Sequence, residues 1–108
     1  MAFKIALTPT YLAKVEVNMP KESGGFESSD FWAKFKRVDV AELEALRALP
    51  QKEVIGRVLV GWTDLLDEES RPVEYGVSTR AALLLIPQVL EGLVYAFWTS
   101  IYKAREKN

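Results

Sequence analysis

The sequence contains neither cysteine nor histidine. Without cysteine, the chain cannot form a disulfide, a thiolate zinc site or a thiol nucleophile. Without histidine, it lacks the side chain that most often serves as general base or zinc ligand. A phosphate-binding loop is missing too, because no GKS or GKT sequence follows the Gly24-Gly25 pair. We therefore predict that the chain is not an enzyme and has no catalytic residue, metal or cofactor.

A strong charge of one sign is also lacking. The 14 lysines and arginines nearly balance the 15 aspartates and glutamates, and the net charge is −1. This balance removes the attraction on which nucleic-acid-binding proteins depend, so we expect neither nucleic acid nor a membrane as partner. Basic side chains near Trp32 could still line a strand that binds single-stranded nucleic acid, although the exposed face of an antiparallel strand explains them more simply. These side chains are Lys34, Lys36 and Arg37.

The composition of the 108-residue chain, 49% hydrophobic and 27% charged, is typical of one folded domain. We expect a single domain over residues 1–108, with a β-hairpin region at 1–38 and a helical region at 39–108. The first residues reach Pro9 without a long apolar segment, so no signal peptide is expected. Together with the lack of cysteine, this favours a cytosolic protein.

An antiparallel β-hairpin is expected near the start of the chain. Apolar and polar side chains alternate in residues 14–19, and residues 31–38 are rich in aromatic side chains. Both patterns are typical of strands. Between them, residues 20–30 contain proline, paired glycines and three serines, which predicts a long, mobile loop. Residues 3–7 could add a third strand. Whether the loop over 21–29 binds a partner or only connects the strands stays open.

Four helices are expected after the hairpin, which gives an α+β fold. Asp39 is a candidate N-cap of a short first helix, with Glu42 placed as in a capping box. The spacing of apolar residues predicts a second helix over 51–62. Ser78 is a candidate N-cap of a third helix that reaches about residue 86. Pro87 either kinks this helix or opens the last one, which should continue to about residue 107.

The connection between the second and third helices carries several carboxylates. Such a cluster could hold a hard cation such as Ca²⁺, but it lacks the alternating ligands and the central glycine of an EF-hand loop. A solvated acidic turn is therefore expected. Nothing places two of the carboxylates in an apolar pocket where they could do acid–base work. The carboxylates are those of Asp64, Asp67, Glu68 and Glu69.

The last helix is apolar on nearly its whole circumference, so both of its faces need cover. At 100° per residue, one face is expected to join the core: Val89, Leu93, Ala96, Phe97 and Ser100. On the opposite side lies a stripe, here called the aromatic stripe, that we predict to bind a partner: Glu91, Tyr95, Trp98 and Tyr102. Tyrosine and tryptophan suit this role because they combine a large area with a polar tip. The stripe could instead pack on the hairpin of the same chain, or serve self-association and a client polypeptide in turn.

Residues 81–102 also have the length of a membrane span, and basic residues follow them. Glu91 lies near the centre of this segment, where a charge costs roughly 2.5–3.5 kcal/mol on insertion scales. The rest of the chain has the composition of a domain that can pack on this helix in water. We therefore do not expect a membrane anchor.

The order of aromatic, acidic and apolar features resembles a known family. A β-rich start leads into the block Phe31-Trp-Ala-Lys-Phe-Lys-Arg37, followed by a helix of acidic residues and leucines. Trp62 then precedes the acidic connection, Pro72 and Tyr75, and two apolar helices end in a basic tail. This pattern resembles the tail assembly chaperones of long-tailed bacteriophages and prophages. The likeness runs from about Val15 onward and consists of hydrophobic and aromatic positions, not of a catalytic signature.

The resemblance implies a small non-catalytic protein made in the cytoplasm of the infected host cell. Such chaperones bind the long, largely helical tape measure protein before tail tube subunits polymerise around it. They tend to self-associate and are absent from the finished tail. A structural tail component or an adaptor that stays in the particle is the alternative. The family also commonly makes a longer product by −1 frameshifting, and GAA and AAA codons for Glu106 and Lys107 would supply a slippery heptamer before Asn108.

Overall fold

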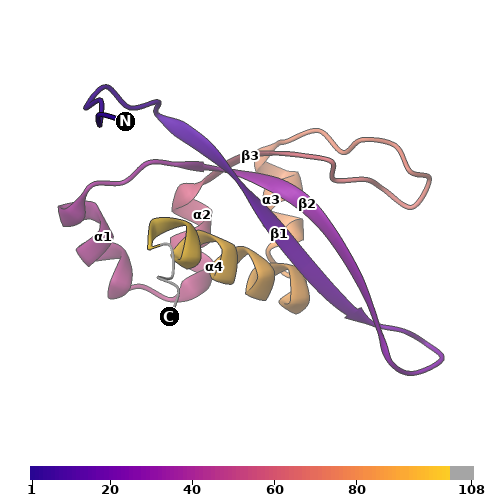
Figure 1. The fold of residues 1–108 in the computed structure, drawn as a ribbon. Coiled ribbons are helices and arrows are strands. Elements are labelled where there is room, and N and C mark those ends of the chain that lie inside the picture. Colours follow the sequence, from indigo (N-terminus) through magenta and orange to yellow (C-terminus); the bar gives the residue numbers. More distant parts are fainter. Residues whose placement is uncertain (103–108) are drawn as a thin grey trace, which may run out of the picture.

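The computed structural model describes residues 1–102 and shows a three-stranded antiparallel sheet and four helices over that range (Figure 1). The strands are β1 (Thr10–Pro20), β2 (Phe26–Lys36) and β3 (Leu59–Thr63), in the spatial order β1-β2-β3. The helices are α1 (Val40–Arg47), α2 (Gln51–Val58), α3 (Val77–Leu83) and α4 (Pro87–Ile101). The predicted α+β class is confirmed. The predicted end of the last helix near residue 107 and the slippery site at 106–108 lie outside the described residues.

The first two strands form the predicted hairpin, but they are longer and their turn is shorter than expected. β1 and β2 pair without interruption over their whole length. The turn is confined to residues 21–25, where Gly24 and Gly25 have φ angles of 95° and 75° that glycine adopts without steric cost. The predicted loop over 20–30 was wrong in its second half, because cross-strand pairing satisfies the backbone of the polar residues 26–30.

The third strand was predicted at the wrong place. Residues 3–7 form no strand; instead, β3 follows α2 directly and pairs with β2, with Ala33 opposite Trp62. The second helix, predicted over 51–62, therefore ends early, at Val58. The residues after this point are mostly β-branched, aromatic or otherwise compatible with a strand. Pairing with β2 decides against continuation of the helix.

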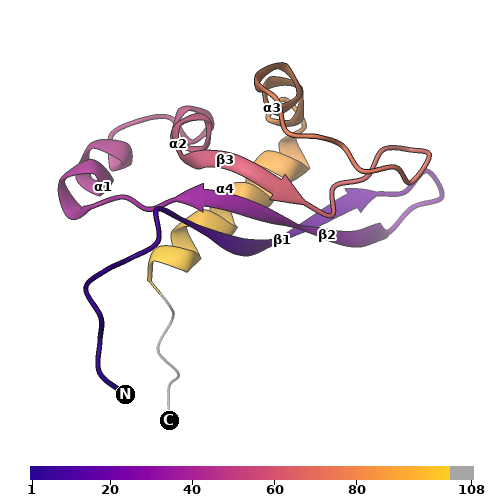
Figure 2. The same ribbon diagram turned by 90° about the horizontal axis from the view of Figure 1, so that it is seen from above.

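The core lies between one face of the sheet and the helices. α4 runs across this face and packs chiefly on β1, with α2 beside it (Figures 1 and 2). Phe35 of β2 meets Phe97 of α4 edge to face, with 5.3 Å between the ring centroids. Alternate residues of the two long strands complete the interface, among them Val15, Phe31 and Ala33. The opposite face of the sheet is exposed, as in many antiparallel sheets.

Local signals fix where two of the helices begin. Asp39 caps α1 as predicted, and its side chain accepts a hydrogen bond from the Glu42 N–H at 2.8 Å. The Glu42 carboxylate pairs with a lysine of β2 at 2.8 Å and not with the Asp39 backbone, so only half of a capping box is present. Pro87 opens α4. The prediction for Ser78 was wrong, because the N-cap of α3 is Gly76, two residues earlier, and Ser78 lies inside the helix.

The segment that leads into α3, together with Arg80 of α3, contacts β3 at its first residue and at Trp62. The Leu59 carbonyl oxygen accepts hydrogen bonds from the Tyr75 hydroxyl at 3.1 Å and from the Arg80 guanidinium at 3.3 Å. The Tyr75 ring also packs on Trp62, with 4.8 Å between the centroids, and the Trp62 indole N–H donates to the Val73 carbonyl oxygen at 2.8 Å. These contacts hold the segment that leads into α3 against β3.

None of the described helices is by itself long and apolar enough to cross a membrane. α3 and α4 reach that length only as a pair, and the chain bends by 102° between them. The apolar segment 81–102 is therefore divided between two helices of different direction.

Candidate functional site

α4 turns one face toward the core and the opposite face outward. Four apolar residues of the predicted inner face are buried as expected: Val89, Leu93, Ala96 and Phe97. Ser100 was assigned to the same face but is exposed, and its hydroxyl lies 2.7 Å from the Tyr11 hydroxyl at the margin of the sheet. The buried face fixes the helix, so the outward face has a defined position.

The four residues of the aromatic stripe fall into two groups. Glu91 and Tyr95, in the first nine residues of α4, line a groove beside β1, and Tyr95 is 72% exposed. Trp98 and Tyr102, at the other end of the helix, lie near α1 and α2. The structure therefore places the stripe along two different neighbours and not along one.

Trp98 holds α4 to the other helices. Its indole N–H donates to the Gln51 side-chain oxygen at 3.0 Å, and its ring packs edge to face on Phe97. The Arg47 guanidinium lies 6.0 Å from the Trp98 ring and 5.7 Å from the Tyr102 ring, and it donates to the Tyr102 hydroxyl at 2.9 Å. Trp98 thus packs within the chain and contacts side chains of α1 and α2, while both tyrosines of the stripe stay accessible.

A groove of about 580 Å³, here called the polar groove, runs between the outward face of α4 and β1. Gly92 sets the close approach of helix and strand, because a Cβ atom at this position would lie 2.5 Å from the Glu16 carbonyl oxygen. The lining combines charged, amide and aromatic side chains from both elements: Lys14, Glu16 and Asn18 of β1, and Gln88, Glu91, Tyr95 and Thr99 of α4.

The backbone of β1 adds hydrogen-bonding groups to the polar groove. At the two ends of the hairpin, the Arg37 N–H donates to the Pro9 carbonyl and the Lys21 N–H donates to the Gly25 carbonyl. Hydrogen-bonded and non-bonded pairs alternate along antiparallel strands, so the odd-numbered residues of β1 are the ones that bond to β2. The N–H and C=O groups of even-numbered residues, such as Glu16, therefore point to the outer edge of the sheet. The sequence carries no signal for this feature, because strand order depends on pairing between distant segments.

A second groove, here called the apolar groove, lies between the outer half of the hairpin, the acidic connection and the junction of α3 and α4. It has a volume of about 420 Å³, and its charged residues are Asp30 and Asp64. Apolar side chains from four segments dominate its lining: Val17, Met19, Phe31, Leu65, Leu66, Leu83, Ile86 and Val89. Sequence reasoning missed this groove, because no local pattern links these segments.

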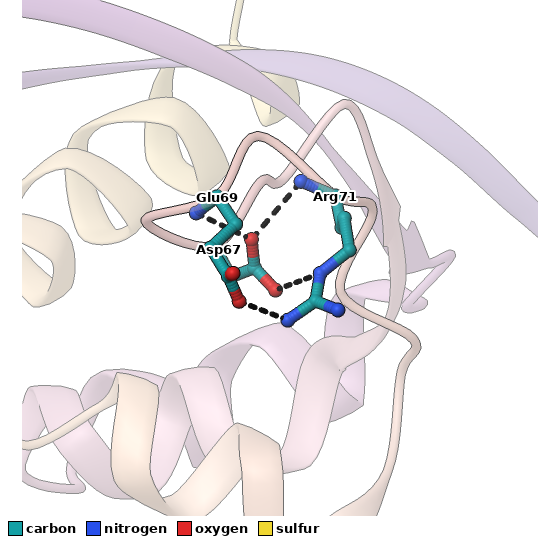
Figure 3. A network of polar contacts seen from close by, with 3 residues as sticks. All are labelled: Asp67, Glu69 and Arg71. Atoms are coloured by element: carbon teal, nitrogen blue, oxygen red, sulfur yellow. Dashed lines mark hydrogen bonds and ion pairs between the residues drawn. The ribbon is translucent and has the colours of Figure 1, made fainter.

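The acidic connection folds into a turn that uses its own carboxylates (Figure 3). The Asp67 carboxylate accepts the backbone N–H of Glu69 at 2.8 Å and that of Arg71 at 3.0 Å. The Arg71 guanidinium pairs with Asp67 at 3.4 Å and also with the Glu69 carboxylate. The Arg71 N–H, more than the Glu69 N–H and the Arg71 side chain, lowers the pKa of Asp67 below its usual value, against a smaller opposing effect of desolvation.

The four carboxylates considered for a cation do not gather in the structure. Within residues 1–102, no group of three or more acidic side chains is placed to hold a metal ion. Asp67 and Glu69 are engaged with Arg71, and Asp64 lines the apolar groove. The arrangement is that of an acidic turn held by its own arginine.

The basic residues near Trp32 divide between two environments. Lys34 and Lys36 lie on the same outer face of β2 as Trp32, as the alternation of a strand requires. Arg37 lies beyond the strand, and its Nε donates to the Thr8 carbonyl oxygen at 2.7 Å. The structure therefore brings only two of the three basic side chains to the face that carries the tryptophan.

The two grooves and the tyrosines of α4 are the accessible features that sequence and structure single out. Within residues 1–102, no polar or charged side chain is buried. The grooves offer apolar area, hydrogen-bonding groups and charges of both signs, a combination that suits contact with another polypeptide. No family model, curated protein or solved structure matches the chain.

Proposed function

We propose that the chain is a phage tail assembly chaperone, a non-catalytic protein that binds the tape measure protein in the host cytoplasm during tail morphogenesis. The observation that supports this most directly is the outward face of α4. Tyr95 and Tyr102 are 72% and 57% exposed there, although the opposite face of the same helix is buried in the core. Aromatic area held in place by a packed helix is typical of surfaces that bind other proteins.

The client segment in this proposal is an amphipathic helix that lies along α4 and enters the polar groove. Its apolar side chains cover the rings of Tyr95 and Tyr102. Lys14, Glu16 and Glu91 supply charges of both signs at the groove, so polar residues that flank the client's apolar stripe find partners. Binding of a helix in a groove of this kind recurs among peptide-recognition proteins.

The function is tested by measuring how tightly the chain binds the tape measure protein after co-expression and purification. Tyr95→Asp should weaken binding by at least about tenfold, because it removes an aromatic anchor and places a charge in the interface. Val77→Asp puts the same charge on a residue that is 71% exposed at the start of α3, and should leave binding unchanged. Equal losses in the two variants, or no loss in Tyr95→Asp, would contradict the proposal.

The competing function is a structural tail component or an adaptor that stays in the particle. Mass spectrometry of purified particles separates the two, because a chaperone is absent from the finished tail whereas a structural component is present in fixed proportion. The proposal also includes self-association and contact with the tail tube subunit as secondary interactions. Recovery of the chain in stoichiometric amount from tails would replace the chaperone role with the structural one.

A further inference from the structure

The first eight residues carry a strand pattern that their own chain leaves unused. The residues between the large apolar ones are small or polar, as in a strand with one apolar face. Residues 1–8, here called the N-terminal arm, nevertheless form no strand in the described part of the chain. Their large apolar side chains occur at every second position, and each is more than half exposed: Met1, Phe3, Ile5 and Leu7.

The apolar groove has an accessible apolar rim. Leu66, Ile86 and Met19 at this rim are 53%, 38% and 37% exposed, and Val17 and Phe31 beside them belong to the core. An exposed apolar surface bordered by charged residues is typical of a site for another polypeptide. The groove volume of about 420 Å³ falls within the range of ligand-binding pockets, roughly 300–1,000 Å³.

Half of the apolar side chains of the N-terminal arm cannot reach the apolar groove of their own chain. Leu7 precedes Thr10, where β1 begins, by three residues and so reaches at most about 11 Å from that point. The hairpin wall of the groove begins at Val17, which lies about 23 Å along the extended strand from Thr10. Ile5 falls short as well, with a reach of about 18 Å, whereas Phe3 and Met1 reach about 25 and 32 Å. The arm therefore cannot bring its whole apolar face into the groove of its own chain. This limit on length does not apply when the arm binds the groove of a second copy of the chain.

We propose that the N-terminal arm of one copy binds in the apolar groove of a second copy. The apolar face of the arm covers the rim of the groove. Lys4 is the only charged side chain of the arm, and the carboxylate of Asp64 in the groove is complementary to it in charge. Asp30, the other charged residue of the groove, pairs with Lys14 of its own chain at 3.5 Å. This interaction assigns a surface to the self-association that the proposed function includes, and it does not depend on the identity of any client.

Sedimentation equilibrium of the full chain over a range of concentrations measures the self-association. The double variant Phe3→Ser/Ile5→Ser removes apolar area from the arm and should raise the dissociation constant by at least about tenfold. The matched control Ala2→Ser/Ala6→Ser alters the other face of the same arm and should leave the constant unchanged. All four positions are exposed, so far-UV circular dichroism should show the same fold in every variant.

The lack of cysteine in the sequence permits a second test by disulfide cross-linking. A chain with Ile5→Cys is mixed with a chain with Leu66→Cys under oxidising conditions, and a linked pair of the two is expected. Leu12→Cys, on the exposed outer face of the sheet, replaces Leu66→Cys as the control and should give no such product. A chain with both Ile5→Cys and Leu66→Cys should link to other copies and not to itself.

Several results would overturn the proposal. A chain that stays monomeric at every accessible concentration excludes exchange of the arm. Equal effects of the Phe3→Ser/Ile5→Ser and Ala2→Ser/Ala6→Ser variants exclude an interaction through the apolar face. Cross-linking of position 5 to position 66 within one chain, or equal cross-linking to position 12, shows that the arm does not occupy the groove of a second copy. None of these results bears on binding of the tape measure protein, which is tested separately at Tyr95.

Discussion

Gly92 is the residue at which α4 comes closest to the sheet, and its replacement by alanine tests that contact. A Cβ atom at this position would lie 2.5 Å from the Glu16 carbonyl oxygen and 3.1 Å from Val15 Cγ1. The carbonyl belongs to the backbone of β1, which the hairpin holds in place, so α4 must move away from the strand. Added atoms in a packed contact cost about 1–3 kcal/mol. The better helix propensity of alanine, about 1 kcal/mol, offsets only part of this cost.

We therefore expect Gly92→Ala to lower the free energy of unfolding by up to about 2 kcal/mol. Gly56 provides the matched control, because it lies in α2 and a Cβ atom there would have nothing within 4 Å. Gly56→Ala should raise the free energy of unfolding by about 0.4–1 kcal/mol. Urea unfolding followed by tryptophan fluorescence and far-UV circular dichroism measures both changes, provided that the m values agree.

Gly92→Ala and Gly56→Ala are expected to change the free energy of unfolding in opposite directions, and this difference makes the comparison decisive. A Gly92→Ala variant at least as stable as the parent chain, with an unchanged m value, would refute the reasoning, because α4 could not then pack against the Glu16 carbonyl. Equal losses in both variants would show that alanine disturbs these helices for a reason other than the contact with β1. A confirmed loss at Gly92 alone would establish how the polar groove obtains its depth.

The remaining predictions concern a helix cap, the aromatic stripe and the acidic turn. Asp39→Ala should lower the free energy of unfolding by about 1 kcal/mol, whereas Asp39→Asn should keep most of the stability that the cap supplies. Equal losses of stability for the two variants in urea unfolding would count against the cap. Trp98→Ala should lower the free energy of unfolding by about 2 kcal/mol, since the ring is half-buried. Tyr95→Ala should change it by no more than about 0.5 kcal/mol, because Tyr95 is exposed. A larger loss for Tyr95→Ala than for Trp98→Ala would be inconsistent with the packing described. The pKa of Asp67 is lower in the folded chain than its usual 3.8. The ionised Asp67 carboxylate therefore stabilises the turn fully above pH 3.8, and this stabilisation is lost as the pH falls through the lowered pKa. Hydrogen exchange at the Arg71 N–H, corrected for its intrinsic pH dependence, should then quicken, and Asp67→Asn should abolish this change.

Features that depend on neighbouring residues could be predicted from the sequence. Asp39 was identifiable as an N-cap because its side chain needs only the N–H groups of the next turn. Pro87 marked the start of α4 because its fixed φ angle suits the first turn of a helix. The inward positions of Val15 and Val17 followed from simple alternation. In each case, the physical cause lies within a few residues of the feature.

The third strand could not be placed in this way, because pairing with a distant partner decides it. Residues 3–7 alternate as a strand should, yet no strand of the described chain pairs with them. The residues around Val58 fit a helical face as well as a strand, and the chain leaves α2 there because β2 offers unpaired backbone groups to β3. Sequence periodicity describes what a segment can form, and the partner determines what it does form.

The candidate site could be predicted only in part. The helical spacing correctly indicated which side of α4 faces the core, and therefore which side carries Tyr95. Tyr102 follows the end of α4 and has an extended backbone, so the spacing does not place it. It could not show that Trp98 reaches Gln51, because the turn that brings α2 beside α4 is a property of the whole fold. Both grooves were missed for the same reason, since each is walled by segments that lie far apart in the sequence.

Contacts at both outer edges of the sheet oppose growth by strand addition. Tyr75 and Arg80 bind the Leu59 carbonyl oxygen at the edge of β3, and Gly92 of α4 lies close to the Glu16 carbonyl oxygen at the edge of β1. A strand that added to either edge would have to displace one of these contacts. The fold therefore disfavours stacking of one molecule on the next through its sheet.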